Sequence, residues 1–378
     1  MRLTCSQRFA ISALIATLCA TGLSAPANAQ TRPQDWSLTR LYSVGGESDT
    51  AILQRVQSLQ QLRDRRLLIA DAGARSVIVV DSLGRVRPPL GRMGSGPAEY
   101  RAPQALAVIG DTVAVLDPGN GRIGLFSSSG AWQGSWVVQP ITGGTNVRLY
   151  RVPGADFYAY GVRKIGAKLA TTFIHFDPRG PRDTLAPDPE PTSPDFGAMC
   201  NGSDRGIRFF STTFQSRHVR IPGPRGTLLD AETSAYRIVH HTLAGDTVAT
   251  FAGPATRVPI SNAEWDSAGA EFAAYLKQDK DAKCSTRSLS RPSSKPAIRA
   301  FWWDDAGRLW VERYATSGFA FDVFSQRGAL LASMPAPERV SDVEPSVVGN
   351  RIALLGATAD GAHVVHVYRF GLILQFHI

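Results

Sequence analysis

Pairs of short apolar stretches, each pair bridged by a tight turn, recur along the chain. The first pair is RLLIADAGARSVIVVDSLGRV at 66–86, and the second is TVAVLDPGNGRIGLFSSSGAW at 112–132. In both, the first apolar stretch ends in Asp, a turn with Gly and then Arg follows, and the second apolar stretch ends in a turn with Ser and Gly. Short β-rich stretches bounded by such residues are typical of antiparallel strands joined in hairpins.

Looser copies of this pattern begin at Asp156, Gly226, Gly307 and Asn350, which brings the number of predicted hairpins to six. Asp71 and Asp117, at equivalent places in the first two copies, are 46 residues apart. A repeat of about 40–50 residues with four strands per copy is typical of β-propeller blades. The pattern therefore predicts an all-β fold, a six-bladed β-propeller of four-stranded antiparallel blades.

Each blade also needs an inner strand before its hairpin and a fourth strand after it. Six stretches fit the inner strand: 56–62, 104–110, 146–152, 214–221, 297–303 and 344–350. Two stretches fit the fourth strand especially well: 132–138 and 246–253.

The segment LTRLYSVGG at 38–46 precedes the first blade and has no blade of its own. We predict that it pairs with the C-terminal hairpin and completes the sixth blade, because an open sheet edge invites pairing with other chains. The C-terminal tail, GLILQFHI at 371–378, could take the same place, and the sequence does not decide between them.

The loop GRMGSGPAEYRAP at 91–103 has glycines spaced as in a phosphate-binding loop. It lacks the Lys of a P-loop and the third Gly of a dinucleotide loop, and a β-rich stretch rather than a helix follows it. Nucleotide binding is therefore disfavoured, and the glycines are expected to serve the path of the chain.

Together with the stretch up to about residue 135, this loop resembles an NHL-type β-propeller repeat, in which a Gly-Pro-Glu-aromatic loop lies between blades. The matching turn residues are Asp117, Gly119, Asn120 and Arg122, with Asp71 and Arg75 as their counterparts in the first repeat. The resemblance implies an interblade connection with structural roles for these residues. Asp117 and Asn120 are expected to bond turn backbone and Arg122 to pair with a carboxylate of the same turn. The segment 296–314 also looks like bacterial six-bladed propellers of this class.

Two connections between predicted blades are long, 178–212 and 254–296, and the second contains a predicted helix. Ser261 and Glu264 form a capping box at its start. Four apolar residues then share one helical face: Trp265, Ala268, Phe272 and Leu276. The insertions lie between blades 3 and 4 and between blades 4 and 5, and should leave the same rim.

Each insertion carries one cysteine, Cys200 in the first and Cys284 in the second. Because the insertions should emerge side by side, a Cys200–Cys284 disulfide is expected to fasten a cap over one face. Two buried free thiols are the alternative. The cap could act as a functional lid or could merely cover apolar blade ends.

Residues 1–29 have the pattern of a signal peptide, with basic residues first, the apolar stretch 9–23 next and Ala-Asn-Ala at 27–29 last. Cleavage is expected between Ala29 and Gln30, which leaves 30–378 as a single propeller domain. No later stretch is apolar enough to span a membrane. The expected location is periplasmic or secreted.

The formal net charge is +9, with 41 Lys and Arg against 32 Asp and Glu. Basic proteins can bind nucleic acid, but here the basic residues are dispersed and form no run. We therefore expect no nucleic acid partner and no membrane span. The chain is expected to be a monomer with a protein or glycan ligand in the cell envelope.

No catalytic or metal-ligating residue is assigned. The seven His residues include only His218 on a predicted inner strand, and no G-x-S-x-G turn is present. The alternative function is a calcium-dependent hydrolase or lyase of the lactonase-like six-bladed type. Asp304, Asp305 and Glu344 lie near ends of inner strands and could supply oxygen ligands to calcium.

The preferred function is a non-enzymatic binding module, because propellers present loops around a central channel. Arg217, His218 and Arg220, on or near the inner strand of blade 4, could meet an acidic ligand. Trp302 and Trp303, at the inner strand of blade 5, could stack on a sugar or peptide. One of these two is expected to pack in the core, because neighbouring residues of a strand face opposite sides.

Overall fold

The computed structural model describes residues 33–46, 52–137, 148–153, 157–165, 168–185, 196–203, 207–211, 214–253, 256–286, 291–340 and 342–372. Residues from Pro33 onward form one compact unit. The predicted signal peptide, including Ala29 and the cleavage position at Gln30, lies outside the described residues. Within them, no helix is long and apolar enough to cross a membrane.

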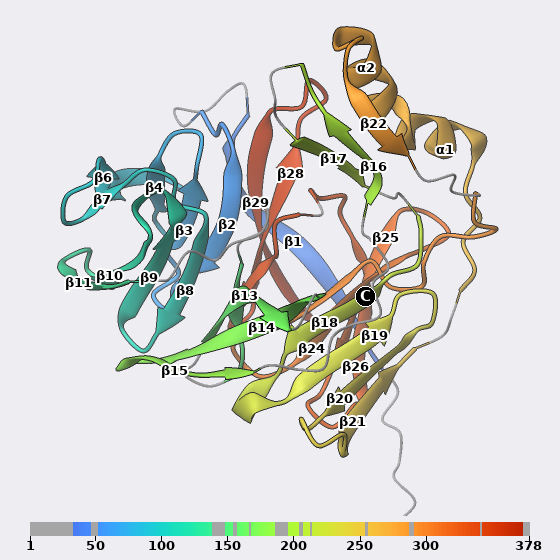
Figure 1. The fold of residues 1–378 in the computed structure, drawn as a ribbon. Coiled ribbons are helices and arrows are strands. Elements are labelled where there is room, and N and C mark those ends of the chain that lie inside the picture. Colours follow the sequence, from blue (N-terminus) through green and yellow to red (C-terminus); the bar gives the residue numbers. More distant parts are fainter. Residues whose placement is uncertain are drawn as a thin grey trace, which may run out of the picture. The chain divides into compact units, whose positions relative to one another are not determined.

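Strands dominate, and most of them lie in antiparallel sheets of four strands that follow one another in chain order (Figure 1). The first sheet contains β2 (Val56–Gln61), β3 (Leu67–Asp71), β4 (Ser76–Val80) and β5 (Val86–Leu90). The second contains β8 (Ala105–Ile109), β9 (Thr112–Asp117), β10 (Arg122–Ser127) and β11 (Trp132–Val137). The third contains β12 (Leu149–Arg151), β13 (Phe157–Ile165), β14 (Lys168–Asp177) and β15 (Gly180–Leu185). The fourth contains β18 (His218–Pro222), β19 (Leu228–Glu232), β20 (Arg237–His241) and β21 (Thr247–Ala252).

The remaining long strands form one sheet in the order β23-β24-β25-β26-β1-β29-β28-β27. Its first half, the fifth group, contains β23 (Ala300–Trp303), β24 (Leu309–Tyr314), β25 (Phe319–Phe324) and β26 (Leu330–Ala336). Its second half, the sixth group, contains β27 (Ser346–Val348), β28 (Arg351–Ala357), β29 (His363–Leu372) and β1 (Gln34–Gly45). The hairpins predicted from the sequence are thus all present as paired strands, and each sheet has the strand order of a propeller blade.

Strand β1 joins the two ends of the chain. It pairs antiparallel with β29 from Trp36 to Gly45, and parallel with β26 at Gln34 and Asp35. This confirms that the N-terminal segment completes the C-terminal hairpin. Gly371 and Leu372 of the competing tail continue β29 itself, and the rest of that tail lies outside the described residues.

The turn between the third and fourth strands repeats in the first five groups. A residue with a short polar side chain begins it, and a glycine with positive φ follows three positions later: Asp81/Gly84, Ser127/Gly130, Asp177/Gly180, Thr242/Gly245 and Ser325/Gly328. Glycine adopts this left-handed conformation without steric cost, which lets two strands reverse tightly. The sixth group has no such turn, because its fourth strand comes from the other end of the chain.

Apolar side chains pack between neighbouring sheets rather than within one sheet. One cluster joins the first and second sheets, another joins the second and third, and a large one runs from the third through the fourth to the fifth group. Two further clusters join the fifth group to the sixth and the sixth to the first. Each sheet is therefore buried on both faces by its neighbours.

The two long connections contain a separate group of strands and helices (Figure 1). It contains β16 (Phe196–Asn201), β17 (Ile207–Ser211), α1 (Asn262–Ala268), α2 (Ala270–Gln278) and β22 (Lys283–Thr286), and we call it the cap. Its strands pair in the order β17-β16-β22, with Cys200 opposite Cys284. The expected Cys200–Cys284 disulfide is present, which confirms that the two insertions meet.

The predicted capping box is also present, since the Ser261 side chain accepts the Glu264 N–H and Glu264 accepts the Ser261 N–H. The helix is broken at Gly269 into α1 and α2. As a result the predicted apolar face is only partly used: Phe272 packs on Phe210 with ring centroids 4.9 Å apart, whereas Leu276 is 40% exposed.

Candidate functional site

In the first two sheets, the Asp at the end of the second strand binds the loop that leads into the first strand of the same sheet. Asp71 is fully buried and accepts the backbone N–H groups of Gln54 and Arg55 at 2.7 and 2.9 Å. Asp117 accepts those of Arg101 and Ala102 at 3.1 and 2.8 Å. Each carboxylate thus satisfies two donors that no strand partner reaches. These contacts are consistent with the structural role predicted for Asp71 and Asp117.

The glycine two positions after each Asp lies against the same loop. A Cβ on Gly119 would come within 2.6 Å of the Arg101 Cβ, and a Cβ on Gly73 within 2.7 Å of the Gln54 Cβ. No other residue fits this close approach without a shift of the loop. The Asp-x-Gly spacing therefore marks a contact between this turn and the loop that enters the same sheet from the preceding one. We call this contact the joint between consecutive sheets.

Asn120 and Arg122 bind the Gly-rich loop from the other side. The Asn120 side chain donates to Gly94 O at 3.0 Å and to Asp117 Oδ2 at 2.7 Å, and Arg122 donates to the carbonyls of Gly96 and Glu99 at 2.5 and 3.0 Å. The loop is thus an interblade connection.

The expected pairing of Arg122 with a carboxylate is wrong, because Glu99 directs its carboxylate to Arg92 at 2.8 Å instead. Arg75 does not take the place of Arg122 in the first sheet. It is exposed and contacts Met93 Sδ at 3.8 Å.

Two of the three residues proposed for ligand binding in the fourth sheet, His218 and Arg220, meet on one carboxylate. Asp230 on β19 accepts from Arg220 on β18 at 2.6 and 3.1 Å, and it lies 2.6 Å from His241 Nε2 and 3.3 Å from His218 Nε2. We call His218, Arg220, Asp230 and His241 the Asp230 cluster. Burial opposes ionisation of Asp230, but hydrogen bonds from His218, Arg220 and His241 outweigh it and hold the pKa of this carboxyl well below its usual range.

This arrangement bears on two of the residues proposed to contact a ligand, Arg220 and Arg217. The Arg220 guanidinium is held by Asp230 in a two-point pair, so its charge is balanced within the protein. His241, which lies on the third strand, joins the cluster although no motif in the sequence points to it. Arg217 remains exposed, with its N–H bound to Thr233 Oγ1 at 2.9 Å.

The proposed stacking surface of Trp302 and Trp303 is corrected by the structure. The two residues are 1% and 2% exposed, and they lie in different apolar clusters on the two faces of β23. Trp302 meets Phe321 edge-to-face at 5.7 Å, and Trp303 meets His240 at 5.8 Å. Both indoles are core residues, because each face of β23 is covered by a neighbouring sheet.

Inner strands from three sheets meet around Arg151. This residue of β12 donates to Gln60 Oε1 at 3.2 Å, to Ser346 Oγ at 3.1 Å and to Pro345 O at 2.8 Å, and it lies 3.4 Å from Glu344 Oε1. The Arg151 side chain thus connects the first, third and sixth groups.

Glu344 is the most unusual acid of this group. Burial raises its pKa, and the charges of Arg151 and Arg148 offset this only in part. Its side chain nevertheless keeps 25% of its surface exposed, so water reaches a carboxyl that lies deep among the inner strands. Glu344 is one of three acids that, from the sequence, could supply oxygen ligands to calcium, and in the structure its partner is Arg151.

The other two carboxylates considered for calcium have separate partners. Asp304 is 4% exposed and accepts from the Arg308 side chain at 2.6 Å and from Trp310 Nε1 at 2.8 Å. Asp305 accepts the Gly349 N–H at 3.0 Å. Among the described residues, no group of three His, Cys, Asp or Glu side chains converges in a way that could hold a metal ion.

The cap is fastened to the fifth group by one cation. Lys295 Nζ lies 2.5 Å from Glu264 of α1 and sits over the rings of Phe214 and Tyr314 at 5.8 and 5.2 Å. The hydrogen bond from Lys295, with those from Ser261, lowers the pKa of Glu264 to about 2. Lys295 thus links the start of α1 to the residues Phe214 and Tyr314.

The two helices themselves cover little. None of their residues is fully buried, and the aromatic side chains of Trp265, Phe272 and Tyr275 are all only half-buried. Together with the exposed Leu276, they form an apolar stripe that remains partly in contact with solvent.

The sequence matches no protein-family model and no curated protein. Solved structures with a similar fold include a member of the DUF4221 family from Bacteroides vulgatus, with 8% identity over 90% of this chain and 100% of that chain and a TM-score of 0.47. A streptogramin B lyase has 12% identity over 90% of this chain and 98% of that chain, with a TM-score of 0.40. A regucalcin from Agrobacterium tumefaciens has 11% identity over 89% and 95%, with a TM-score of 0.40. At these values the similarities assign neither a family nor an activity to this chain.

Proposed function

We propose that this chain is an exported binding module, a six-bladed β-propeller of NHL-like type that presents its cap to a protein ligand. The observation that carries the proposal is the cap itself. Two insertions, separated by a complete sheet, are joined by paired strands and a disulfide and are docked on the sheets by Lys295. A chain that fixes exposed helices in this way holds a surface ready for a partner.

The count of six blades is supported by the order of the apolar clusters. They connect each four-strand group to the next in chain order and the sixth group back to the first. A closed ring has this pattern of contacts, whereas an open stack of sheets would leave its two outer faces uncovered. The role of β1 as the last strand of the sixth group supports the same conclusion.

A protein ligand is favoured over a glycan by the exposed side chains. The tryptophans that could have stacked on a sugar are buried in the core. The cap instead offers a half-buried Trp265 and a 40% exposed Leu276 on consecutive helices. Tryptophan and apolar side chains on a rigid element are the usual centre of a protein–protein interface.

The test is a cross-linking capture from the envelope fraction of the producing cells, with the mature chain 30–378 and two variants. Trp265→Ala and Leu276→Glu together are expected to reduce the yield of the specific partner at least tenfold. Leu243→Glu is the matched control, because Leu243 is 55% exposed on the β20–β21 turn, away from the cap.

The captured protein is then purified and titrated against the three chains. A partner bound equally by the cap variant and by the wild type contradicts the proposal. So does a wild-type chain that binds peptidoglycan fragments or an envelope polysaccharide and no protein.

A further inference from the structure

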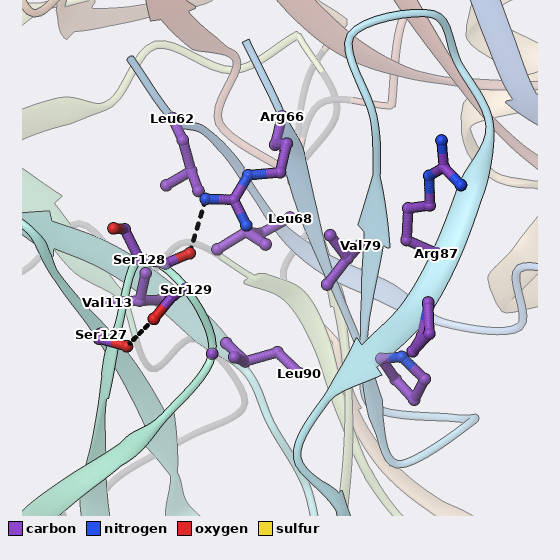
Figure 2. Close-up of a pocket in the computed structure, with 13 residues that line it drawn as sticks. Leu62, Arg66, Leu68, Val79, Arg87, Leu90, Val113, Ser127, Ser128 and Ser129 are labelled. Carbon is purple, nitrogen blue, oxygen red and sulfur yellow. Dashed lines mark hydrogen bonds between the residues drawn. The ribbon is translucent and has the colours of Figure 1, made fainter. Parts of the chain in front are cut away.

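A pocket of about 310 Å³ lies between the first and second sheets, beside the turns that join β2 to β3 and β10 to β11 (Figure 2). Its floor consists of aliphatic side chains from both sheets: Leu62, Leu68, Val79, Leu90 and Val113. Their exposed fractions run from 1% to 8%, so the floor belongs to the apolar core. The volume is at the lower end of the range for small-molecule sites, about 300–1,000 Å³. A ligand here is small, and most of its contact is with hydrocarbon.

The wall of the pocket carries two guanidinium groups and no carboxylate. Arg66 donates through Nη2 to Ser128 O at 2.6 Å and through Nε to Asp64 at 2.8 Å. Arg87 donates through Nε and Nη2 to Asp81. Arg66 Nη2 also lies 2.6 Å from Asp64, so each guanidinium is paired with an aspartate, and neither aspartate lines the pocket.

Unused donors remain on this wall. Among the described residues, no hydrogen bond is made by Nη1 of Arg66, by Nη1 of Arg87 or by the hydroxyl of Ser128. Figure 2 shows the Arg66 guanidinium between Leu62 and Leu68, next to the Ser128 turn, with Arg87 at the opposite wall beyond Val79. Arg66 thus presents an unused Nη1 donor at the edge of the aliphatic floor, with the Ser128 turn beside it.

We propose that this pocket binds a small apolar carboxylate, such as a medium-chain fatty acid. The carboxylate accepts hydrogen bonds from Arg66 and Ser128, and the hydrocarbon chain packs on Leu68, Val79 and Leu90. Charge-assisted bonds to a guanidinium are roughly twice as strong as neutral ones. A cationic amphiphile would place its charge beside two guanidinium groups, and an alcohol would give up the ion pair. This site is separate from the cap and does not depend on a protein partner there.

The experiment is a calorimetric titration of the mature chain 30–378 with octanoate, 1-octanol and octylammonium. Octanoate is expected to bind saturably at one site per chain. Octanol is expected to bind at least tenfold more weakly, since a hydrogen bond to a charged group contributes about 1.5–3 kcal/mol, and tenfold in affinity corresponds to about 1.4 kcal/mol. Octylammonium is expected not to bind.

The key variant is Arg66→Met, which keeps the aliphatic stem and removes the guanidinium. It should weaken octanoate at least tenfold and leave octanol unchanged. Arg85→Met is the matched control, because Arg85 is also an arginine beside an aspartate, has 66% of its side chain exposed and does not line the pocket. Urea unfolding of each variant verifies that the sheets are intact.

Ser128→Ala provides a second variant if Arg66→Met fails to fold, and it should weaken octanoate about threefold to fivefold through loss of one hydrogen bond. The proposal is overturned if octanoate gives no saturable binding, or if octanol or octylammonium binds as tightly. It is equally overturned if a folded Arg66→Met variant, or Ser128→Ala in its place, binds octanoate like the wild type.

Discussion

Thr233 Oγ1 accepts the backbone N–H of Arg217 at 2.9 Å, and this hydrogen bond occupies the place that Asp71 and Asp117 take in the first two sheets. The acceptor lies sixteen residues after the donor in all three cases. The backbone of Thr233 adds a second bond, from its N–H to Arg217 O at 3.0 Å. The joint between consecutive sheets is therefore retained in the fourth sheet with a neutral side chain in place of a carboxylate.

The charged version of this joint should contribute more to stability than the neutral one. Asp117→Ala removes a buried carboxylate that accepts two backbone N–H groups and is expected to lower the free energy of unfolding by about 3 kcal/mol, whereas Thr233→Val should lower it by about 1 kcal/mol. Urea unfolding followed by tryptophan fluorescence measures both values. Asp111→Ala is the control, because Asp111 is exposed. Equal losses for Asp117→Ala and Asp111→Ala would show that the joint has no energetic role.

Glu312 is fully buried between two arginines and should not tolerate loss of its charge. Its carboxylate lies 2.9 Å from Arg299 and 2.7 Å from Arg339, and Arg339 is itself 4% exposed. Glu312→Gln removes the buried negative charge that both guanidinium groups contact and is expected to cost about 3–5 kcal/mol of stability. The thermal unfolding midpoint of this variant is compared with that of Glu338→Gln. Glu338 is exposed and precedes Arg339 in the sequence. The interpretation fails if the two variants unfold at the same temperature.

Acid should weaken the fourth sheet through Asp230. The pKa of this carboxyl is lower in the folded chain than its ordinary value of 3.8, so the ionised form is favoured by folding. The resulting stability is fully present above about pH 5 and is lost as the pH falls through about 4 toward the folded pKa. Asp230→Asn removes this dependence.

The measurement is the urea midpoint between pH 6 and pH 2 for the wild type and for Asp230→Asn. The wild type should lose more stability on acidification than the variant. Glu264, whose pKa is lowered to about 2, adds a smaller decline in the same direction in both proteins. Parallel curves for the two proteins would exclude a role for the Asp230 cluster in acid sensitivity.

The disulfide should stabilise the cap and leave the sheets unchanged. Cys200 and Cys284 are 84 residues apart in the sequence, and the segment between them includes the whole fourth sheet. The double variant Cys200→Ser, Cys284→Ser is expected to increase amide hydrogen exchange in β16 and β22 at least tenfold, because the covalent bond no longer limits their separation. Exchange in β9 and β10 serves as the internal reference. Unchanged exchange in β16 and β22 would mean that strand pairing alone holds the cap.

The strands could be predicted from the sequence because the repeat uses a small set of residues. Alternating apolar stretches located the hairpins, and Gly with Asp or Ser located the turns. The Asp-x-Gly joint was visible in the first two copies. In the fourth copy Thr233 accepts the equivalent backbone N–H in place of Asp. Because the residue type differs, comparison of the sequences does not reveal that the hydrogen bond is the same.

The side-chain sites were harder to predict, since they depend on which residues neighbouring sheets bring together. Trp302 and Trp303 were assigned to a channel because β23 is an inner strand, but neighbouring sheets cover both of its faces. His241 was set aside because it lies on a third strand, although strand pairing places it beside Asp230. The pocket at Arg66 combines two sheets and a turn, and no single stretch of sequence contains it.

The place of β1 also sets an order of events in folding. A chain is synthesised from its N-terminus, so β1 is made first, while its partner β29 is made last. Every other four-strand group can form once its own consecutive strands are available. The earliest strand must therefore wait with an unpaired edge until the final hairpin exists, and only a full-length chain can close. A chain that lacks β29 leaves the edge of β1 unpaired, and an open strand edge is a site for pairing with other chains.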